Sequence, residues 1–307
     1  MAESTASPVR DDLTFGRANS ALQTLSATLS RNQQDAEAHN LRCRVYYQEE
    51  QWDQAVNDCE AAVSLAQGNS DFHLWLGRAY GQKAAHASIM SAYPLARRTH
   101  AEFEQAVQLD PHNAAALADL GEFDVAAPAM VGGGLGKADA IAQQLSAVNP
   151  AGARILSARI AESKKDYAGA EAAFKEAITK SSYPADAWMD LASFYRRRGR
   201  IDEMLSAAHT GASLDKAHGF ALVDGAANLT LAGREPGTAI LWLGEYLRSK
   251  AQSELAPAFV VRAQLAQLLR QQGNEAAAQV QLAAVHALAS GYRIPAAPIA
   301  TTRVAGL

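Results

Sequence analysis

The segment from Met130 to Lys137 is the part of the chain that comes closest to a nucleotide-binding motif. It reads Met-Val-Gly-Gly-Gly-Leu-Gly-Lys, and a glycine-rich loop that ends in lysine can cradle phosphate oxygens with its backbone amides. However, Gly132 stands one position too close to Gly136 for that motif, and Ala138 lacks the hydroxyl that would bind Mg²⁺. The favoured interpretation is a turn that leads into a helix near Lys137. The alternative is an enzyme in which this loop binds a nucleotide.

Cysteine and histidine do not indicate a metal centre or covalent catalysis. The chain has two cysteines and eight histidines, and neither His86 nor His100 has a carboxylate or a cysteine at ligand spacing. No G-x-S-x-G or H-E-x-x-H sequence is present. We therefore expect no catalytic residue, no metal and no cofactor, and we do not expect an enzyme.

The composition indicates which elements must position these residues. The 307 residues are 49% apolar but only 7% aromatic, and alanine, the best helix former, supplies much of the difference. An all-β fold is disfavoured, because strands prefer β-branched and aromatic residues. A net charge of −4 argues against nucleic acid as a partner, and no apolar run approaches the roughly 20 residues of a membrane span.

Two adjacent segments, 151–184 and 185–218, have equal length and carry complementary halves of one motif. The second has the spacing W-x2-L-[GA]-x2-Y and the first has A-x3-F, in Trp188, Leu191, Ala192, Tyr195, Ala170 and Phe174. This pattern at a period of 34 residues resembles the tetratricopeptide repeat family. The nearest resemblance is to a bacterial subgroup with a glycine-rich insertion inside a repeat.

The resemblance implies an all-α fold, an α-α solenoid or superhelix of about seven repeats built from antiparallel helix pairs. We expect a flexible N-terminus over 1–13, a solenoid over 14–290 and an extended C-terminal tail over 291–307. Within the solenoid, Thr14 to Arg31 should supply one helix that caps the array. The repeats are expected near 36–69, 70–113, 114–150, 151–184, 185–218, 219–258 and 259–290.

Two consecutive repeats are longer than the pattern allows. About ten extra residues fall within Gln82 to Arg98, and about five surround the glycine-rich segment Met130, Val131, Gly132, Gly133 and Gly134. Because both insertions fall between the two helices of their repeats, we expect them side by side on one edge, which is often a binding surface. The alternative is that they only lengthen or cap helices.

In the repeat register, Cys43 and Cys59 take positions that face each other across one helix pair. Buried free thiols are the default expectation. An intra-repeat disulfide is the alternative for an exported chain. The polar segment from Met1 to Asp12 shows no signal peptide, and the same sequence would result if a signal peptide had been removed, so the compartment stays open.

In related repeats the first helix of each pair lines the concave groove. Carried onto this sequence, the groove positions include Asn40, Arg44, Tyr47, Arg78, Gln82, Glu122, Arg159, Arg196 and Arg197. Their arginine bias suits an acidic peptide, although Arg196 and Arg197 also fit a solvated helix end. We expect a non-enzymatic scaffold or adaptor that binds a protein or peptide in the groove or at the insertion-bearing edge. The alternative is a structural protein that self-assembles through repeat ends or the tail.

Overall fold

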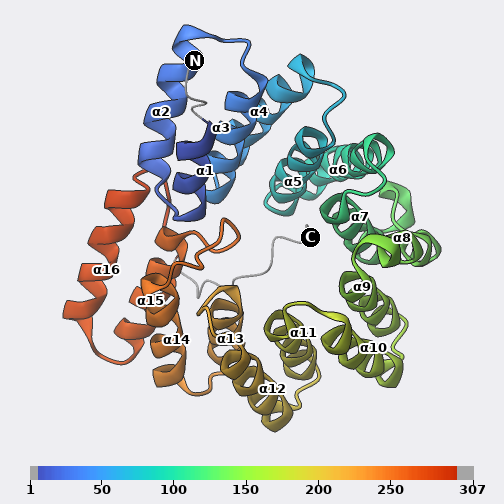
Figure 1. The fold of residues 1–307 in the computed structure, drawn as a ribbon, viewed down its shortest axis with the longest axis vertical. Coiled ribbons are helices and arrows are strands. Elements are labelled where there is room, and N and C mark those ends of the chain that lie inside the picture. Colours follow the sequence, from blue (N-terminus) through green and yellow to red (C-terminus); the bar gives the residue numbers. More distant parts are fainter. Residues whose placement is uncertain (1–5, 296–307) are drawn as a thin grey trace. The chain divides into compact units, whose positions relative to one another are not determined.

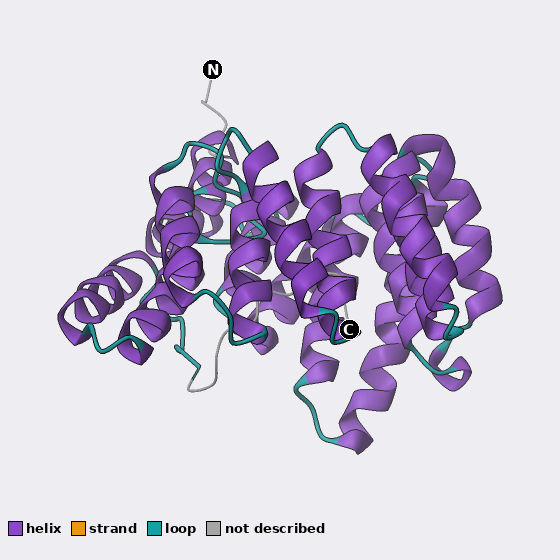
Figure 2. Ribbon diagram, turned by 90° about the horizontal axis from the view of Figure 1, so that it is seen from below, coloured by secondary structure: helices purple, strands orange, loops and turns teal. Residues whose placement is uncertain are grey.

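The structure is a computed structural model that describes residues 6–295, and all the regular elements in that range are helices (Figure 2). The prediction of an all-α chain is confirmed. The helices are α1 (Ala6–Thr14), α2 (Ala18–Arg31), α3 (Ala36–Gln48), α4 (Trp52–Leu65), α5 (Ser70–Ala85), α6 (Ile89–Leu109), α7 (Ala114–Ala126), η1 (Ala129–Val131), α8 (Leu135–Val148), α9 (Pro150–Ser163), α10 (Tyr167–Lys180), α11 (Pro184–Arg197), α12 (Ile201–Leu214), α13 (Phe220–Leu231), α14 (Pro236–Arg248), α15 (Ala258–Gln271) and α16 (Glu275–Leu288).

Short polar side chains fix where several helices begin. Asn69, Asn113, Asn149 and Asp166 each accept a hydrogen bond from a backbone N–H in the first turn of the helix that follows. Such caps satisfy amides that have no partner within the helix. Asn69, Asn113 and Asn149 thus set the starts of α5, α7 and α9, and Asp166 sets the start of α10.

Glycine and close packing hold the two helices of a pair together. Gly199 and Gly273 turn the chain inside their pairs with φ of +70° and +75°, as the sequence predicts. Gly77 lies so close to the Phe103 ring that a Cβ would approach it to 2.6 Å. Gly121 is packed in the same way on Leu156. Small residues at these positions therefore let neighbouring helices make direct contact.

The chain divides into two compact units, and each is described by itself. Within the described residues, the first comprises 6–26, 48–50 and 183–295, and the second comprises 27–47 and 51–182. In both units consecutive helices pair as neighbours, for example α5 with α6 and α11 with α12 (Figure 1). The solenoid over 14–290 with the repeat bounds given above stays a prediction.

The N-terminus differs from the expectation of a flexible segment followed by one capping helix. Helix α1 begins at Ala6 and buries Val9 and Leu13, so the sequence that was expected to be flexible is helical from Ala6 onward. Gln48 donates to the carbonyl oxygens of Leu13 and Glu254 at 3.1 Å. A helix therefore precedes the single capping helix that was expected, and the prediction of a flexible segment was wrong over 6–13 because two buried apolar residues in a polar segment give little periodic signal.

Helix α2 contacts the end of α16 in the same unit. Asn19 of α2 donates to the carbonyl oxygens of His286 and Ala287, and its amide oxygen accepts from Ser290. These bonds satisfy carbonyl groups at the C-terminal end of α16. In the tail predicted over 291–307, Tyr292 is buried against Phe259, and residues 296–307 lie outside the described residues.

Candidate functional site

The two insertions lie together in the second unit. The first lengthens α6, which begins at Ile89 and carries Pro94 in its interior. The second forms the turn around the short helix η1. Tyr93 of α6 donates a hydrogen bond to the carbonyl oxygen of Met130 at 3.3 Å. The insertions are therefore neighbours, and the surface that they form is called the insertion edge below: Ile89, Met90, Tyr93, Pro94, Arg97, Met130 and Lys137.

The glycine-rich turn uses its own amides internally. The N–H groups of Gly132, Gly133 and Gly134 donate to the carbonyl oxygens of Ala129, Pro128 and Asp124. The Lys137 ammonium donates to the carbonyl oxygen of Gly132 at 2.8 Å. A phosphate loop needs free amides that point at the ligand, so this turn does not have the geometry of a nucleotide-binding loop.

Gly132 sits directly on a buried histidine. Its φ is +114°, and a Cβ at that position would lie 2.5 Å from Nδ1 of His100. His100 in turn lies 3.4 Å from Asp124 and 3.4 Å from Glu104, and its ring packs on Phe123. The sequence prediction missed both carboxylates: Glu104 follows His100 by four residues on the same helix, and Asp124 comes from the next repeat. The His100 ring packs directly against the turn at Gly132.

Large apolar side chains gather on the insertion edge. The exposed fractions are 92% for Ile89, 89% for Met90, 43% for Tyr93 and 70% for Met130. Ile89, Tyr93 and Arg97 follow each other at intervals of four residues, so they share one face of α6. Exposed apolar patches on a protein surface mark interaction sites.

The charge around this apolar surface is positive. Arg97 is exposed, and it makes no ion pair or hydrogen bond within residues 6–295. The Arg98 guanidinium donates a hydrogen bond to the Tyr80 hydroxyl at 3.2 Å and lies 3.7 Å from the carboxylate of Glu60. Lys137 is exposed next to the glycine-rich turn. The edge thus differs from the chain as a whole, whose net charge is −4.

Three predicted groove residues surround Trp75 of α5. The guanidinium groups of Arg44 and Arg78 lie 4.9 and 4.7 Å from its ring centroid, and Tyr47 meets the ring edge-on. Asn40 is buried with no hydrogen-bond partner for its Nδ2 atom, and Gln82 is half-buried. Sequence analysis did not select Trp75, although it is one of only four tryptophans.

Several predicted groove arginines are engaged by carboxylates of neighbouring helices. Arg78 lies 2.6 Å from Asp119, and both side chains are nearly buried. Burial raises the pKa of Asp119 above its usual range, and the charge of Arg78 opposes this shift. Arg159 lies 3.4 Å from Glu122. These arginines have less charge to offer an acidic peptide than the sequence suggested.

The remaining groove arginines belong to the first unit. Arg196 donates to the side-chain oxygen of Asn228 at 3.0 Å. Burial, together with the charge of Arg197, lowers the pKa of Arg196 below the usual value. Sequence analysis weighed a solvated helix end against a groove position for this pair. Arg196 is partly buried against α13 and does not fit a fully solvated end.

Cys43 of α3 and Cys59 of α4 form a disulfide, with their Cα atoms 5.3 Å apart. Both residues are buried. The default expectation of two free thiols was wrong. The same helix pair carries a bidentate contact from Arg42 to Asp58 at 2.7 and 2.6 Å, so its two helices are joined covalently and by charge.

Within residues 6–295 no group of three potential ligands from histidine, cysteine, aspartate and glutamate could hold a metal ion. No helix in the same range combines the length and apolarity that crossing a membrane requires.

Comparison with solved structures identifies the fold. The yeast protein Tom70 matches with a TM-score of 0.57 at 14% identity over 94% of this chain and 61% of its own. A tetratricopeptide repeat protein from Parabacteroides merdae matches with a TM-score of 0.52 at 13% identity over 92% of this chain and 97% of its own. The fold is that of the tetratricopeptide repeat proteins. A thermophilic tetratricopeptide repeat protein from Thermus thermophilus, TTC0263, also matches with a TM-score of 0.52 at 20% identity over 62% of this chain and 98% of its own.

The likeness is confined to structure. No family model matches the sequence, and no curated protein matches it. The family resemblance read from the repeat motif is supported at the level of fold. A fold does not determine a function, so the function of this chain must be argued from its own surface.

Proposed function

We propose that this protein is a non-enzymatic interaction scaffold whose insertion edge binds an apolar segment of a partner protein flanked by acidic residues. The observation that carries the proposal is the exposure of Ile89, Met90 and Met130 on adjacent insertions. Packing of the repeats does not explain this exposure, since the side chains point away from the core. Methionine suits such a role because it adapts to irregular apolar partners.

The acidic component of the partner follows from the charge at the edge. Arg97 stands one turn beyond Tyr93 on the same face of α6, and it is exposed. A carboxylate of the partner would meet its guanidinium with bidentate geometry. The groove around Trp75 supports the proposal less well, because Arg78 is already engaged by Asp119.

Self-assembly is the competing function, and the charge at the edge bears on it. A symmetric contact between two copies of the edge would bring two Arg97 side chains together without a carboxylate between them. An acidic partner avoids this repulsion. Sedimentation at high protein concentration should therefore give a monomer, while a dimer that Ile89→Asp dissolves would favour self-assembly.

A displayed library of random peptides provides a defined probe. Peptides selected on the wild-type protein should combine apolar residues with aspartate or glutamate. Their binding should fall by about tenfold or more in Ile89→Asp and Met130→Asp. Val280→Asp is the matched control, since Val280 of α16 is 65% exposed and lies far from the insertions in sequence. If the affinity of the selected peptides is unchanged in the edge variants and falls in Arg44→Glu, the proposal is overturned and the groove is the binding site.

A further inference from the structure

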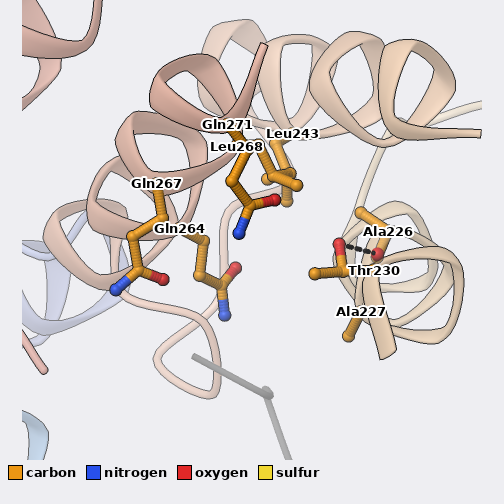
Figure 3. A pocket seen from close by; sticks show the side chains of 8 residues that line it. All are labelled: Ala226, Ala227, Thr230, Leu243, Gln264, Gln267, Leu268 and Gln271. Carbon is orange, nitrogen blue, oxygen red and sulfur yellow. Dashed lines mark hydrogen bonds between the residues drawn. The ribbon is translucent and has the colours of Figure 1, made fainter. Parts of the chain in front are cut away.

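A row of glutamines lines one face of α15 in the first unit. Gln264, Gln267 and Gln271 follow each other at intervals of three and four residues, which places them on one side of the helix. All three line one small space with Ala226, Ala227 and Thr230 of α13, and in Figure 3 the Gln267 side chain points away from α13. The row belongs to the first unit and the insertion edge to the second, and the row has no part in the function proposed above.

Gln264 has an unused hydrogen-bond donor. Its side chain is 6% exposed, and its Nε2 atom has no hydrogen-bond partner. Figure 3 shows the side chain pointing into the space in front of α13. The enclosed space there amounts to about 10 Å³, which accommodates a single oxygen-sized group. A buried amide without a partner destabilises a fold, so an acceptor in this space would be favourable.

Gln267 shows which acceptor suits the row. Its Nε2 atom donates to the main-chain carbonyl oxygen of Pro295 at 2.8 Å. Ile294 and Pro295 also line an open cleft of about 410 Å³, together with Gln267, Gln271 and Leu282. The row is thus already in contact with non-helical backbone of this chain.

We propose that the glutamine row is a binding site for extended main chain and that its occupant is the segment of this chain that follows Pro295, residues 296–303. Gln264 lies about 4.5 Å along α15 from Gln267. Three extended residues span about 10 Å, so the segment reaches Gln264 within a few residues of Pro295.

The sequence of this segment suits the site. It begins Ala-Ala-Pro-Ile and carries no charge before Arg303. The residue before a proline favours extended backbone, and Pro298 has no N–H that would need a partner. The small side chains of Ala296 and Ala297 allow close approach to the alanines of α13, so that a carbonyl oxygen can reach Nε2 of Gln264.

Binding in trans tests the proposal. A chain that ends at Pro295 should bind a fluorescently labelled peptide of residues 296–303, while the complete chain should bind the peptide at least tenfold more weakly because its own segment occupies the site. Gln264→Leu in the shortened chain should lower the affinity for the peptide by about fivefold or more. Gln272→Leu is the matched control, because Gln272 is exposed at the end of the same helix.

Three results would overturn the proposal. They are equal binding by the complete and shortened chains, equal binding by Gln264→Leu and the control, and no binding to the shortened chain at about 1 mM peptide. The last is decisive because a short tether supplies an effective concentration in the millimolar range. If Gln264→Leu lowers the helical circular dichroism signal, Gln264→Met, which keeps the length of the side chain without its hydrogen-bond donor, replaces it and should show the same weakening.

Discussion

The hydroxyl of Tyr93 donates to the main-chain carbonyl of Met130 across 37 positions of sequence. This bond joins the insertion of one repeat to the insertion of the next. It holds Met130 in place while leaving its side chain 70% exposed. The apolar surface of the insertion edge is therefore presented by a fixed turn, which reduces the entropy that binding would otherwise remove.

Gly132 fixes the shape of this turn. Gly132→Ala should lower the free energy of unfolding by about 1–2 kcal/mol, because an alanine is strained at a φ of +114° and its Cβ would meet the His100 ring. Gly136→Ala is the control, since nothing lies within 4 Å of a Cβ there, and it should be neutral or stabilising. Chemical denaturation of both variants measures the difference, and equal effects would contradict the role given to Gly132.

The Cys43–Cys59 bridge should contribute roughly 3 kcal/mol to the stability of the helix pair α3–α4, because it closes a loop with a sequence separation of 16. Thermal unfolding with and without a reductant measures this contribution. The double variant Cys43→Ala/Cys59→Ala should unfold at a lower temperature and be insensitive to the reductant. A double variant as stable as the oxidised wild type would show that the bridge contributes nothing.

Arg78 should act as a structural residue. Its partner Asp119 is 2.6 Å away and both are nearly buried, so Asp119→Asn should cost about 3–5 kcal/mol by leaving a buried charge unpaired. Arg97→Gln, on the exposed face of α6, should change stability by less than about 0.5 kcal/mol. Urea unfolding of the two variants distinguishes these roles. If Asp119→Asn leaves the free energy of unfolding unchanged, Arg78 has no structural role and is again a candidate for partner binding.

Glu49 should make stability fall as the pH rises. Burial raises the pKa of its carboxyl group above the usual range, while the N–H of Gly291 opposes this shift. Because the folded state binds the proton more tightly than the unfolded state, its contribution is complete below the unfolded pKa and is lost as the pH rises through the folded pKa. Thermal midpoints measured from acidic to neutral pH should show this loss in the wild type but not in Glu49→Gln. Parallel curves would contradict it.

The regular parts of the fold were predictable because the repeat motif fixes a register. Once Trp188 and Tyr195 are aligned with their counterparts, the succession of paired helices along the chain follows. Helix α1 was missed because its polar sequence buries only a few side chains. The motif describes contacts that recur in every repeat, and α1 makes contacts that occur once.

The candidate site was less predictable for a related reason. The insertions were visible as extra residues, but the exposure of Ile89 and Met90 depends on where α6 begins. The pairing of Arg78 with Asp119 joins residues 41 positions apart, and no spacing rule specifies it. A groove inferred from arginine positions alone therefore overestimated the positive charge that is available to a partner.

The location of the binding surface is the central claim, and site-specific photo-crosslinking tests it most directly. A photoreactive amino acid is placed at Met90, at Arg44 or at Val280, and each protein is irradiated with a purified peptide selected from the random library. We predict an adduct from position 90 and none from positions 44 and 280. An adduct from position 44 without one from position 90 would contradict the assignment of binding to the insertion edge.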